Sequence, residues 1–334
     1  MIELIFTIDY ELFGNGSGSL KDHVYIPAQR ISQLFEKFGY KLVFFIEVAE
    51  FIKLNDLKQY QFIDHIERQI RNLKISGHEI GLHIHSWWYN AINKDEKWVL
   101  DYNEYNTAIL PIQKIEKQIV SAVDYLKRVL KDDLFQPTSF RAGNWLIQPS
   151  KNILTVLKNN GIKIDSSVFK KGYNSKLKLD FRRSPKKLPY WNIEDDVLTP
   201  QINGSLVEIP IYSEMKPIWC LWKKSKNKVY AGVMKKNNTF RFQNIMDLLN
   251  SFKNYFRIFY PFKFDFTKMP FVEMKNMLDN IIKNNKNTSK SVPIVIIGHT
   301  KNLPAYEEIE KLLIYIKQQN ISVTTFKDII TKLN

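Results

Sequence analysis

The stretch Gly77–Trp88 reads GHEIGLHIHSWW and holds three of the six histidines of this 334-residue chain. Its apolar residues Ile80, Leu82 and Ile84 alternate with Gly81, His83 and His85, a spacing that predicts a β-strand with both histidines on one face. The alternative is a surface strand with two chance histidines, but the apolar neighbours favour burial, where unpaired imidazoles are costly. Two imidazoles on one strand face can share a divalent metal with a nearby carboxylate.

Other short apolar runs of the same kind recur along the chain, and helix-period segments lie between several of them. This alternation predicts an α/β fold with a mainly parallel sheet covered by helices. By itself it fits a doubly wound sheet and a (β/α) barrel equally well. The predicted strands lie near 3–9, 40–48, 78–85, 138–143, 161–167, 205–212, 292–300 and 321–326, and the predicted helices near 27–39, 61–77, 110–131, 149–161 and 307–319.

We expect a single domain over residues 1–334, in which the less regular region 170–290 forms a basic, aromatic insertion or lid. Residues 214–265 contain eleven Lys and Arg against three Asp and Glu, within a chain of net charge +15. This excess reflects either codon bias or attraction to an anionic partner, such as a phosphate-bearing substrate or a membrane surface. Nucleic acid is disfavoured because no DNA- or RNA-binding motif accompanies the charge.

The composition places the protein in a reducing compartment. Cys220 is the only cysteine, so no disulfide can form within the chain. The amino-terminal MIELIFTIDYELFG is predicted to be a first strand and not a signal peptide, and no apolar run approaches the roughly 20 residues of a membrane span. We therefore expect a cytoplasmic protein.

Polar residues end four of the predicted strands, where parallel α/β folds collect their ligands. Asp9 and Glu11 are two residues apart and face the same way on a strand. His83 and His85 repeat that spacing, Arg141 ends SFRAG, and His299 ends a very apolar strand. Each element alone is weak evidence, but four such strand ends together predict an active site.

Two further features near these strand ends allow two interpretations each. The glycine run FGNGSGS, residues 13–19, fits no phosphate-binding motif and is either a flexible loop or a backbone contact to substrate. Trp87, Trp88 and Trp145 are either core residues or a platform on which a sugar ring stacks.

Taken in order, these motifs resemble those of the polysaccharide deacetylase (NodB-homology) family. TIDYE is similar to the first motif of that family and GHEIGLHIHSW to the second. FRAGNW resembles the third motif, DSSVF the fourth and IIGHTK the fifth. The resemblance spans about Ile2 to His299, is confined to the motifs and leaves region 170–290 with little counterpart. It implies an irregular (β/α) barrel with an insertion in its C-terminal half.

The resemblance also implies roles for individual residues. It makes Asp9 the general base, Arg141 the residue that orients the base, and His299 the general acid. A divalent metal, expected to be Zn²⁺, would be held by an acidic residue and two histidines. The residues expected to contact the sugar are Trp87, Trp88, Asn144, Trp145, Asp165 and Ser166, with tuning of His299 as an alternative role for Asp165.

Two departures from the family pattern affect the metal ligands. The second acidic residue, Glu11, comes one position late, and Trp87 stands where the family has its second histidine. Glu11 and His85 are the natural substitutes, because strand alternation gives each the facing of its partner. The alternatives are that Asp9 itself binds the metal, or that the site works without one.

The implied reaction is metal-assisted hydrolysis of an N-acyl group, expected to be acetyl, on an amino sugar. A cytoplasmic location would make the substrate a nucleotide- or lipid-linked precursor of a surface polysaccharide or lipopolysaccharide. Region 214–265 could then contact that anionic substrate or the inner membrane surface. The competing interpretations are a catalytically decayed carbohydrate-binding relative and a metal-independent C–N hydrolase.

Overall fold

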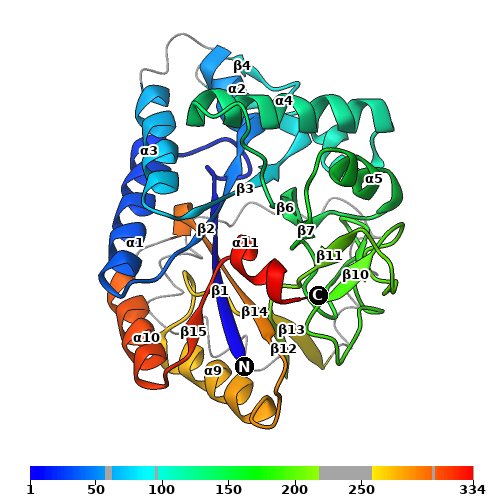
Figure 1. Cartoon of the computed structure of the whole chain (residues 1–334). Helices are drawn as coiled ribbons and strands as arrows, with labels where there is room; N and C mark the ends of the chain where they lie inside the picture. Colours follow the sequence, from blue (N-terminus) through cyan, green and yellow to red (C-terminus); the bar gives the residue numbers. More distant parts are fainter. Residues whose placement is uncertain (57–61, 95–96, 218–257, 303–304, 334) are drawn as a thin grey trace.

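The computed structural model describes residues 1–56, 62–94, 97–217, 258–302 and 305–333. Most of the basic, aromatic region 214–265 lies outside the described residues, so its predicted role as a lid stays a prediction. The described chain forms one nine-stranded sheet with helices around it, and three small two-stranded sheets (Figure 1).

The strands of the large sheet run in the order β10-β11-β7-β6-β3-β2-β1-β14, with β15 also pairing with β1. Apart from β10, which runs antiparallel to β11, the paired strands are parallel. The bounds are β1 Ile2–Tyr10, β2 Val43–Glu47, β3 Glu79–Ile84, β6 Ser139–Ala142, β7 Ile164–Asp165, β10 Trp191–Ile193, β11 Leu206–Glu208, β14 Val292–His299 and β15 Ser322–Val323.

This sheet curls into a half-barrel. Between its two ends, the described residues show single bridges from Ile211 to Val295 and from Asp265 to Ile297, without a continuous ladder. The mainly parallel α/β sheet predicted from the sequence is therefore confirmed, whereas closure into a complete barrel is not shown.

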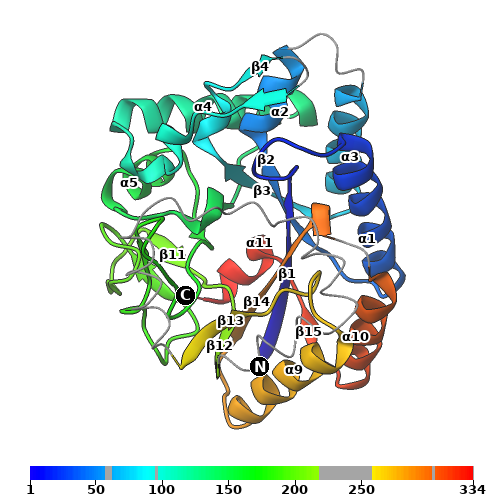
Figure 2. The ribbon, with the colours of Figure 1, turned by 180° about the vertical axis from the view of Figure 1, so that it is seen from behind.

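Helices cover the outer face of the sheet (Figures 1 and 2). The five predicted helices are all present. They are α1 Ile26–Lys37, α3 Ile63–Ile75, α4 Ile112–Leu130, α5 Lys151–Asn159 and α10 Tyr306–Gln318. The prediction missed α2 Val48–Asp56, because it follows β2 directly with no turn residue between them, and it gave no bounds for α9 Phe271–Asn284.

The three small sheets are separate from the nine-stranded sheet. They pair β4 with β5, β8 with β9, and β12 with β13. Their bounds are β4 Ile92–Lys94, β5 Lys97–Val99, β8 Tyr173–Asn174, β9 Leu179–Asp180, β12 Ser213–Pro217 and β13 Phe259–Lys263.

Alternation along β1 divides the core into two clusters. Leu4, Phe6 and Ile8 join the large cluster between the sheet and the helices. Ile5 belongs to a smaller cluster inside the curl, together with side chains of β2, β14 and the short helix α11 (Phe326–Ile329). In Figures 1 and 2, α11 lies at the centre of the ring of helices.

Hydrogen bonds hold α11 at the amino ends of the strands. Glu79, at the start of β3, accepts hydrogen bonds from the Lys327 backbone N–H and from the Ser139 hydroxyl, both 2.8 Å long. This arrangement closes the amino end of the half-barrel with apolar side chains and leaves the carboxyl end to the polar residues.

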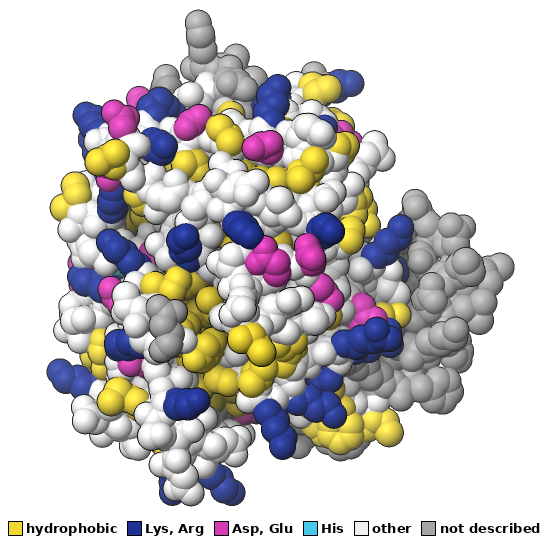
Figure 3. All heavy atoms as spheres, turned by 45° about the vertical axis from the view of Figure 1, so that its right-hand side comes forward, with side chains coloured by type: hydrophobic (Ala, Val, Ile, Leu, Met, Phe, Trp, Pro, Cys, Tyr) yellow, Lys and Arg dark blue, Asp and Glu magenta, His cyan; other side chains and the backbone are white. Residues whose placement is uncertain are grey.

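Charged side chains of the described residues lie on the molecular surface. On the face in Figure 3, lysine and arginine side chains are dispersed among acidic and apolar ones. Among the described residues, no helix is both long enough and apolar enough to cross a membrane.

The position of α11 predicts the effect of removing its main core contact. Phe326 is fully buried and lies 5.9 Å from Phe45, measured between ring centroids. We expect Phe326→Ala to lower the free energy of unfolding by about 3–5 kcal/mol, measured by urea denaturation. Ile314→Ala, at a half-exposed position of α10, is the control, and a similar loss there would contradict the assignment.

Candidate functional site

Strand register brings the polar strand ends together at the carboxyl edge of the sheet. Asp9 pairs with His299 on the neighbouring strand β14. On the other side of β1, Glu47 at the end of β2 pairs with His83, and His83 pairs with Arg141 of β6. Each of these residues is at most 6% exposed. The structure thus places four separately predicted strand ends in one buried polar layer.

Arg141 and Asp9 form the best-defined contact of this layer. Nη1 of Arg141 donates to Oδ1 of Asp9 at 2.6 Å and to the Thr7 hydroxyl at 3.0 Å. Its Nε donates to the backbone carbonyl of Ser166 at 2.9 Å, and the guanidinium lies 4.2 Å from the centre of the Phe45 ring. Because these contacts come from β1, β2 and the end of β7, both the guanidinium and the Asp9 carboxylate have fixed orientations.

A second group contains two carboxylates and two imidazoles. Glu11, Glu47, His83 and His85 are all buried, and one ligand atom from each lies within 4.8 Å of the others. Oε2 of Glu11 is 3.7 Å from Nε2 of His83 and 3.5 Å from Nδ1 of His85. Two ligands of one tetrahedral zinc ion are typically about 3.3 Å apart, so these separations are close to those of a metal site.

The donor atoms of this group fit a divalent cation. Nδ1 of His83 is 2.8 Å from the Arg141 carbonyl and must donate to it, so in the neutral imidazole Nε2 carries the lone pair. That Nε2 is buried and has no hydrogen-bond partner within the described structure. His85 differs, because its Nδ1 is 2.6 Å from Oε2 of Glu47. Glu47 therefore orients His85 and has a second, unpartnered oxygen, Oε1, for an ion.

Charges around this group alter its acidity. Burial alone would raise the pKa of Glu11, but Lys301 and the two histidines hold that pKa well below its usual range. Nζ of Lys301 is 2.7 Å from Oε1 of Glu11, which leaves Oε2 facing the histidines. Burial opposes protonation of His83, yet Glu11, Asp9 and Glu47 raise its pKa to about 9. The raised pKa of His83 shows that the carboxylates create a negative potential at this imidazole, which favours a cation there.

His299 lies between two carboxylates on the other side of Asp9. Its Nε2 is 3.5 Å from Oδ2 of Asp9, and its Nδ1 is 3.8 Å from Oδ2 of Asp265. Burial, with Lys268 and Lys301 nearby, holds the pKa of His299 well below its usual range. The resting imidazole is therefore neutral at pH 7, so His299 can act as the predicted general acid only after it has received a proton.

Aromatic side chains border the two groups. Trp87 stacks on His85 with ring centroids 4.6 Å apart, so it packs against a ligand candidate in place of the histidine that the family resemblance implies. The Trp145 ring stands edge-on to His299, with Nζ of Lys263 3.0 Å from the Trp145 centroid. Trp88 is 1% exposed and packs on Trp98, so it offers no surface to a sugar.

The backbone before Trp145 is strained. Asn144 and Trp145 both have positive φ, 51° and 61°, which is uncommon for consecutive residues other than glycine. Such strain concentrates at functional sites, because the surrounding structure must hold it in place. It turns the chain away from β6 directly after Arg141 and Ala142 and presents the indole beside His299.

Asp165 and Ser166 are fully buried and act within the protein. The Ser166 hydroxyl donates to the Ile209 carbonyl at 2.8 Å, and its backbone carbonyl holds Arg141. Asp165 pairs with Glu208 on the neighbouring strand and accepts a hydrogen bond from Ser167. Neither residue presents a surface to a sugar, and the carboxylate beside His299 is Asp265 instead of Asp165.

Sequence reasoning missed Glu47, Asp265, Lys263 and Lys301 as site residues. Glu47 carried a usable signal, because it is an acidic residue at the carboxyl end of the apolar run LVFFIE, like the ends already identified. Asp265 and Lys263 carry none, since they lie within the region 170–290 that the sequence analysis interprets as an insertion. Only tertiary structure brings them to His299 and Trp145.

Comparison with known proteins finds no match to a family model and none to a curated protein sequence. Solved structures do match. The putative polysaccharide deacetylase from Mycobacterium smegmatis aligns at 14% identity and a TM-score of 0.52, covering 98% of this chain and 88% of that one. PuuE allantoinase aligns at 13% and 0.51, with the same coverages.

This chain shares the fold of these enzymes. A GH57-type branching enzyme from Pyrococcus horikoshii also aligns, at 10% identity and a TM-score of 0.55, over 99% of this chain and 70% of that one. Identities this low show the fold alone. The resemblance to polysaccharide deacetylases is therefore supported at the level of architecture, and the chemistry has to be argued from the site.

The buried pair Asp165 and Glu208 predicts a pH dependence of stability. Burial, and then the Asp165 charge, raise the pKa of Glu208 well above its ordinary 4.5, so folding favours the protonated form. The stability contributed by this proton is complete below pH 4.5 and is lost as pH rises through the folded pKa. We expect Glu208→Gln to become progressively more stable than the wild type as pH rises above 4.5, measured by urea denaturation at several pH values.

The control for this prediction is Glu116→Gln, on α4, where the side chain is exposed. A constant difference in unfolding free energy between wild type and Glu208→Gln at every pH would show that Glu208 carries no shifted proton.

Proposed function

We propose that this protein is a metal-assisted hydrolase that removes an N-acyl group, acetyl in the first instance, from an amino sugar. The observation that carries the proposal is the adjacency of two units in one buried layer. One unit is a carboxylate fixed by an arginine and next to an imidazole, and the other is a group of two carboxylates and two imidazoles with free donor atoms. Hydrolysis of an amide needs a base, an acid and a site that stabilises negative charge on oxygen, and these two units can supply all three.

Glu11, His83 and His85 would hold the ion, with Glu47 as the residue that orients His85 or adds an oxygen ligand. The ion would polarise the acyl carbonyl and lower the pKa of the attacking water. Glu11 suits this role because Lys301 occupies one of its oxygens and leaves the other toward the histidines. The unpartnered Nε2 of buried His83 supports the same assignment.

Asp9 would take the proton from the attacking water. Arg141 occupies Oδ1 of Asp9, and Oδ2 faces His299. A proton received on Oδ2 is therefore within reach of Nε2 of His299, which could pass it to the leaving amine. This route gives a neutral resting imidazole a function, because His299 becomes an acid only after Asp9 has accepted a proton.

The substrate class rests on the fold and on the residues beside the site. The structural neighbours include polysaccharide deacetylases and an allantoinase, as named in their descriptions, and these support hydrolysis of carbon–nitrogen bonds on this fold. Trp145 beside His299 could stack on a sugar ring. Lys263 lies next to Trp145 and could contact an anionic group of a nucleotide- or lipid-linked sugar, in surface polysaccharide or lipopolysaccharide synthesis, including one at a membrane surface.

Metal binding provides the first test. We expect protein purified with Zn²⁺ to retain close to one ion per chain after dialysis, measured by inductively coupled plasma mass spectrometry. Loss of one ligand should weaken zinc affinity in His83→Ala at least about tenfold. His65→Ala, which removes a histidine of α3 outside both groups, is the control. Absence of bound zinc in the wild type, with His83→Ala unchanged, would favour metal-independent hydrolysis or a carbohydrate-binding role.

Catalysis provides the second test. We expect the zinc-loaded protein to release acetate from UDP-linked N-acetylhexosamines, detected with a coupled acetate assay. Asp9→Asn should lower kcat about 10²–10⁴-fold, because it removes the base while keeping the shape of the side chain. Asp124→Asn, an exposed carboxylate on α4, should leave kcat unchanged. Equal rates in wild type and Asp9→Asn would exclude Asp9 as the base.

A further inference from the structure

A cavity of about 540 Å³ lies at the opposite end of the sheet from the candidate active site. It is lined by Val292, Pro293 and Ile294 at the start of β14, whereas His299 ends the same strand. From Ile294 to His299 a strand advances roughly 16 Å, so the cavity and the active site are separate places. A volume of this size is within the range of sites for small molecules.

The lining of this cavity is basic. It includes Lys170, Lys186, Lys187 and Lys290, and the described lining contains no aspartate or glutamate. None of these four lysines has a carboxylate within 4.0 Å among the described residues. Lysines without a described counter-ion around one concave space create a positive potential that favours an anion.

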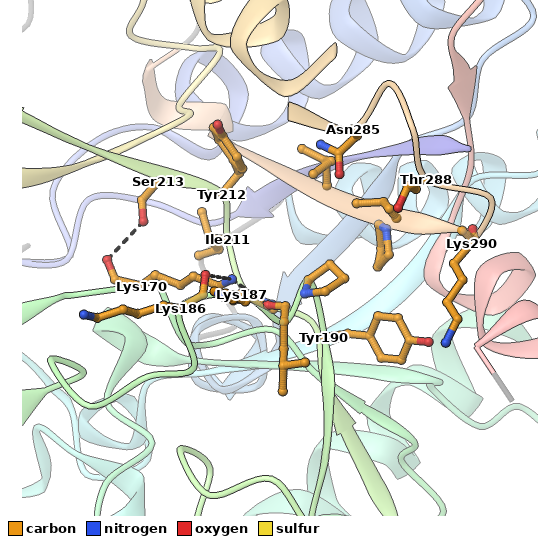
Figure 4. A pocket seen from close by; sticks show the side chains of 17 residues that line it. Lys170, Lys186, Lys187, Tyr190, Ile211, Tyr212, Ser213, Asn285, Thr288 and Lys290 are labelled. Carbon is orange, nitrogen blue, oxygen red and sulfur yellow. Dashed lines mark hydrogen bonds between the residues drawn. The ribbon is translucent and has the colours of Figure 1, made fainter. Parts of the chain in front are cut away.

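Lys170 is the most constrained of the four. Its ammonium donates to the backbone carbonyls of Leu188 at 2.5 Å and of Lys186 at 3.4 Å, which holds the side chain across the cavity (Figure 4). Two acceptors leave one of its three N–H groups for a ligand. Burial lowers the pKa of Lys170 to about 8, because an ammonium group held away from water without a counter-ion is destabilised.

The remaining lining suits an organic molecule that carries a charged group. Figure 4 shows Lys290 and the Tyr190 hydroxyl on the opposite side of the cavity from Lys170, while the end of Lys186 points away. Tyr190, Tyr212 and Ile211 supply aromatic and apolar surface to the same lining. Such a lining contacts an apolar or ring group, while the lysines at either side bind phosphate oxygens.

We propose that this cavity is a second ligand site, separate from the active site, and that it binds a phosphorylated organic molecule such as a nucleoside diphosphate. Lys170 and Lys290 contact the phosphates, and Tyr190 and Tyr212 contact the organic part. The site is independent of the proposed deacylation, because no residue of its lining belongs to the Asp9–Arg141–His299 unit or to the group of carboxylates and histidines.

The test is calorimetric titration of the full-length protein with ADP, adenosine and pyrophosphate at low ionic strength. We expect ADP to bind with one-to-one stoichiometry and more tightly than either adenosine or pyrophosphate. Lys170→Met with Lys290→Met should raise the Kd for ADP about tenfold or more, because two charge-assisted contacts are lost. Lys37→Met with Lys117→Met removes the same charge at exposed positions elsewhere and should leave the Kd unchanged.

Three results would overturn the proposal. These are an ADP affinity that the cavity variant retains, equal weakening by the control variant, and binding of pyrophosphate or adenosine as tight as that of ADP. Because Lys170 ties down the 186–188 loop, its variant could misfold. Lys187→Glu with Lys290→Glu changes only exposed residues of the same lining, and it must also weaken ADP binding about tenfold.

Discussion

The buried charge of Arg141 is the constraint on which the site depends. Its side chain is fully buried, and an unpaired guanidinium there would cost several kcal/mol. It is compensated by contacts to Asp9, Thr7, Ser166 and the face of Phe45, which come from strands far apart in the sequence. Because the backbone carbonyl of Arg141 also accepts from His83, one residue fixes both the general-base candidate and a metal-ligand candidate.

Around this arginine, the interior of the half-barrel is apolar at the amino ends of the strands and polar at their carboxyl ends. At the amino end, Phe326 of α11 and Ile5 of β1 pack in the smaller apolar cluster. Two and four residues after Ile5, the same inward face of β1 carries Thr7 and Asp9, and the ends of β2 and β3 carry Glu47 and His83. The smaller apolar cluster thus supports the buried polar layer. The reactive groups lie on strands, which hold their geometry more rigidly than loops do.

The charges that surround Glu11 differ from those that surround His299. Lys301 neutralises one oxygen of Glu11, while Oε1 of Glu47 and Nε2 of His83 are buried without a hydrogen-bond partner among the described residues. His299, in contrast, stays neutral because of its burial and the nearby charges of Lys268 and Lys301. His83 and His299, two imidazoles of one buried layer, therefore have opposite pKa shifts, the kind of divergence that assigns different roles to similar groups.

The sequence by itself determined the order of strands and helices, because apolar periodicity and turn residues act over a few neighbours. It also identified Asp9, His83, Arg141 and His299 as polar residues at strand ends, where alternation fixes their facing. It did not determine how far the sheet curls. It also gave no sign that Asp165 is buried against Glu208, or that Asp265 takes the place beside His299.

Those features, and the contribution of Glu47, were decided only by tertiary structure. Register between strands depends on the packing of the whole sheet. The pKa of a buried group depends on its burial and on charges that are distant in sequence, as Lys268 lowers the pKa of His299. Local patterns place a side chain on a face. Which charges surround it depends on long-range contacts that no short stretch of sequence encodes.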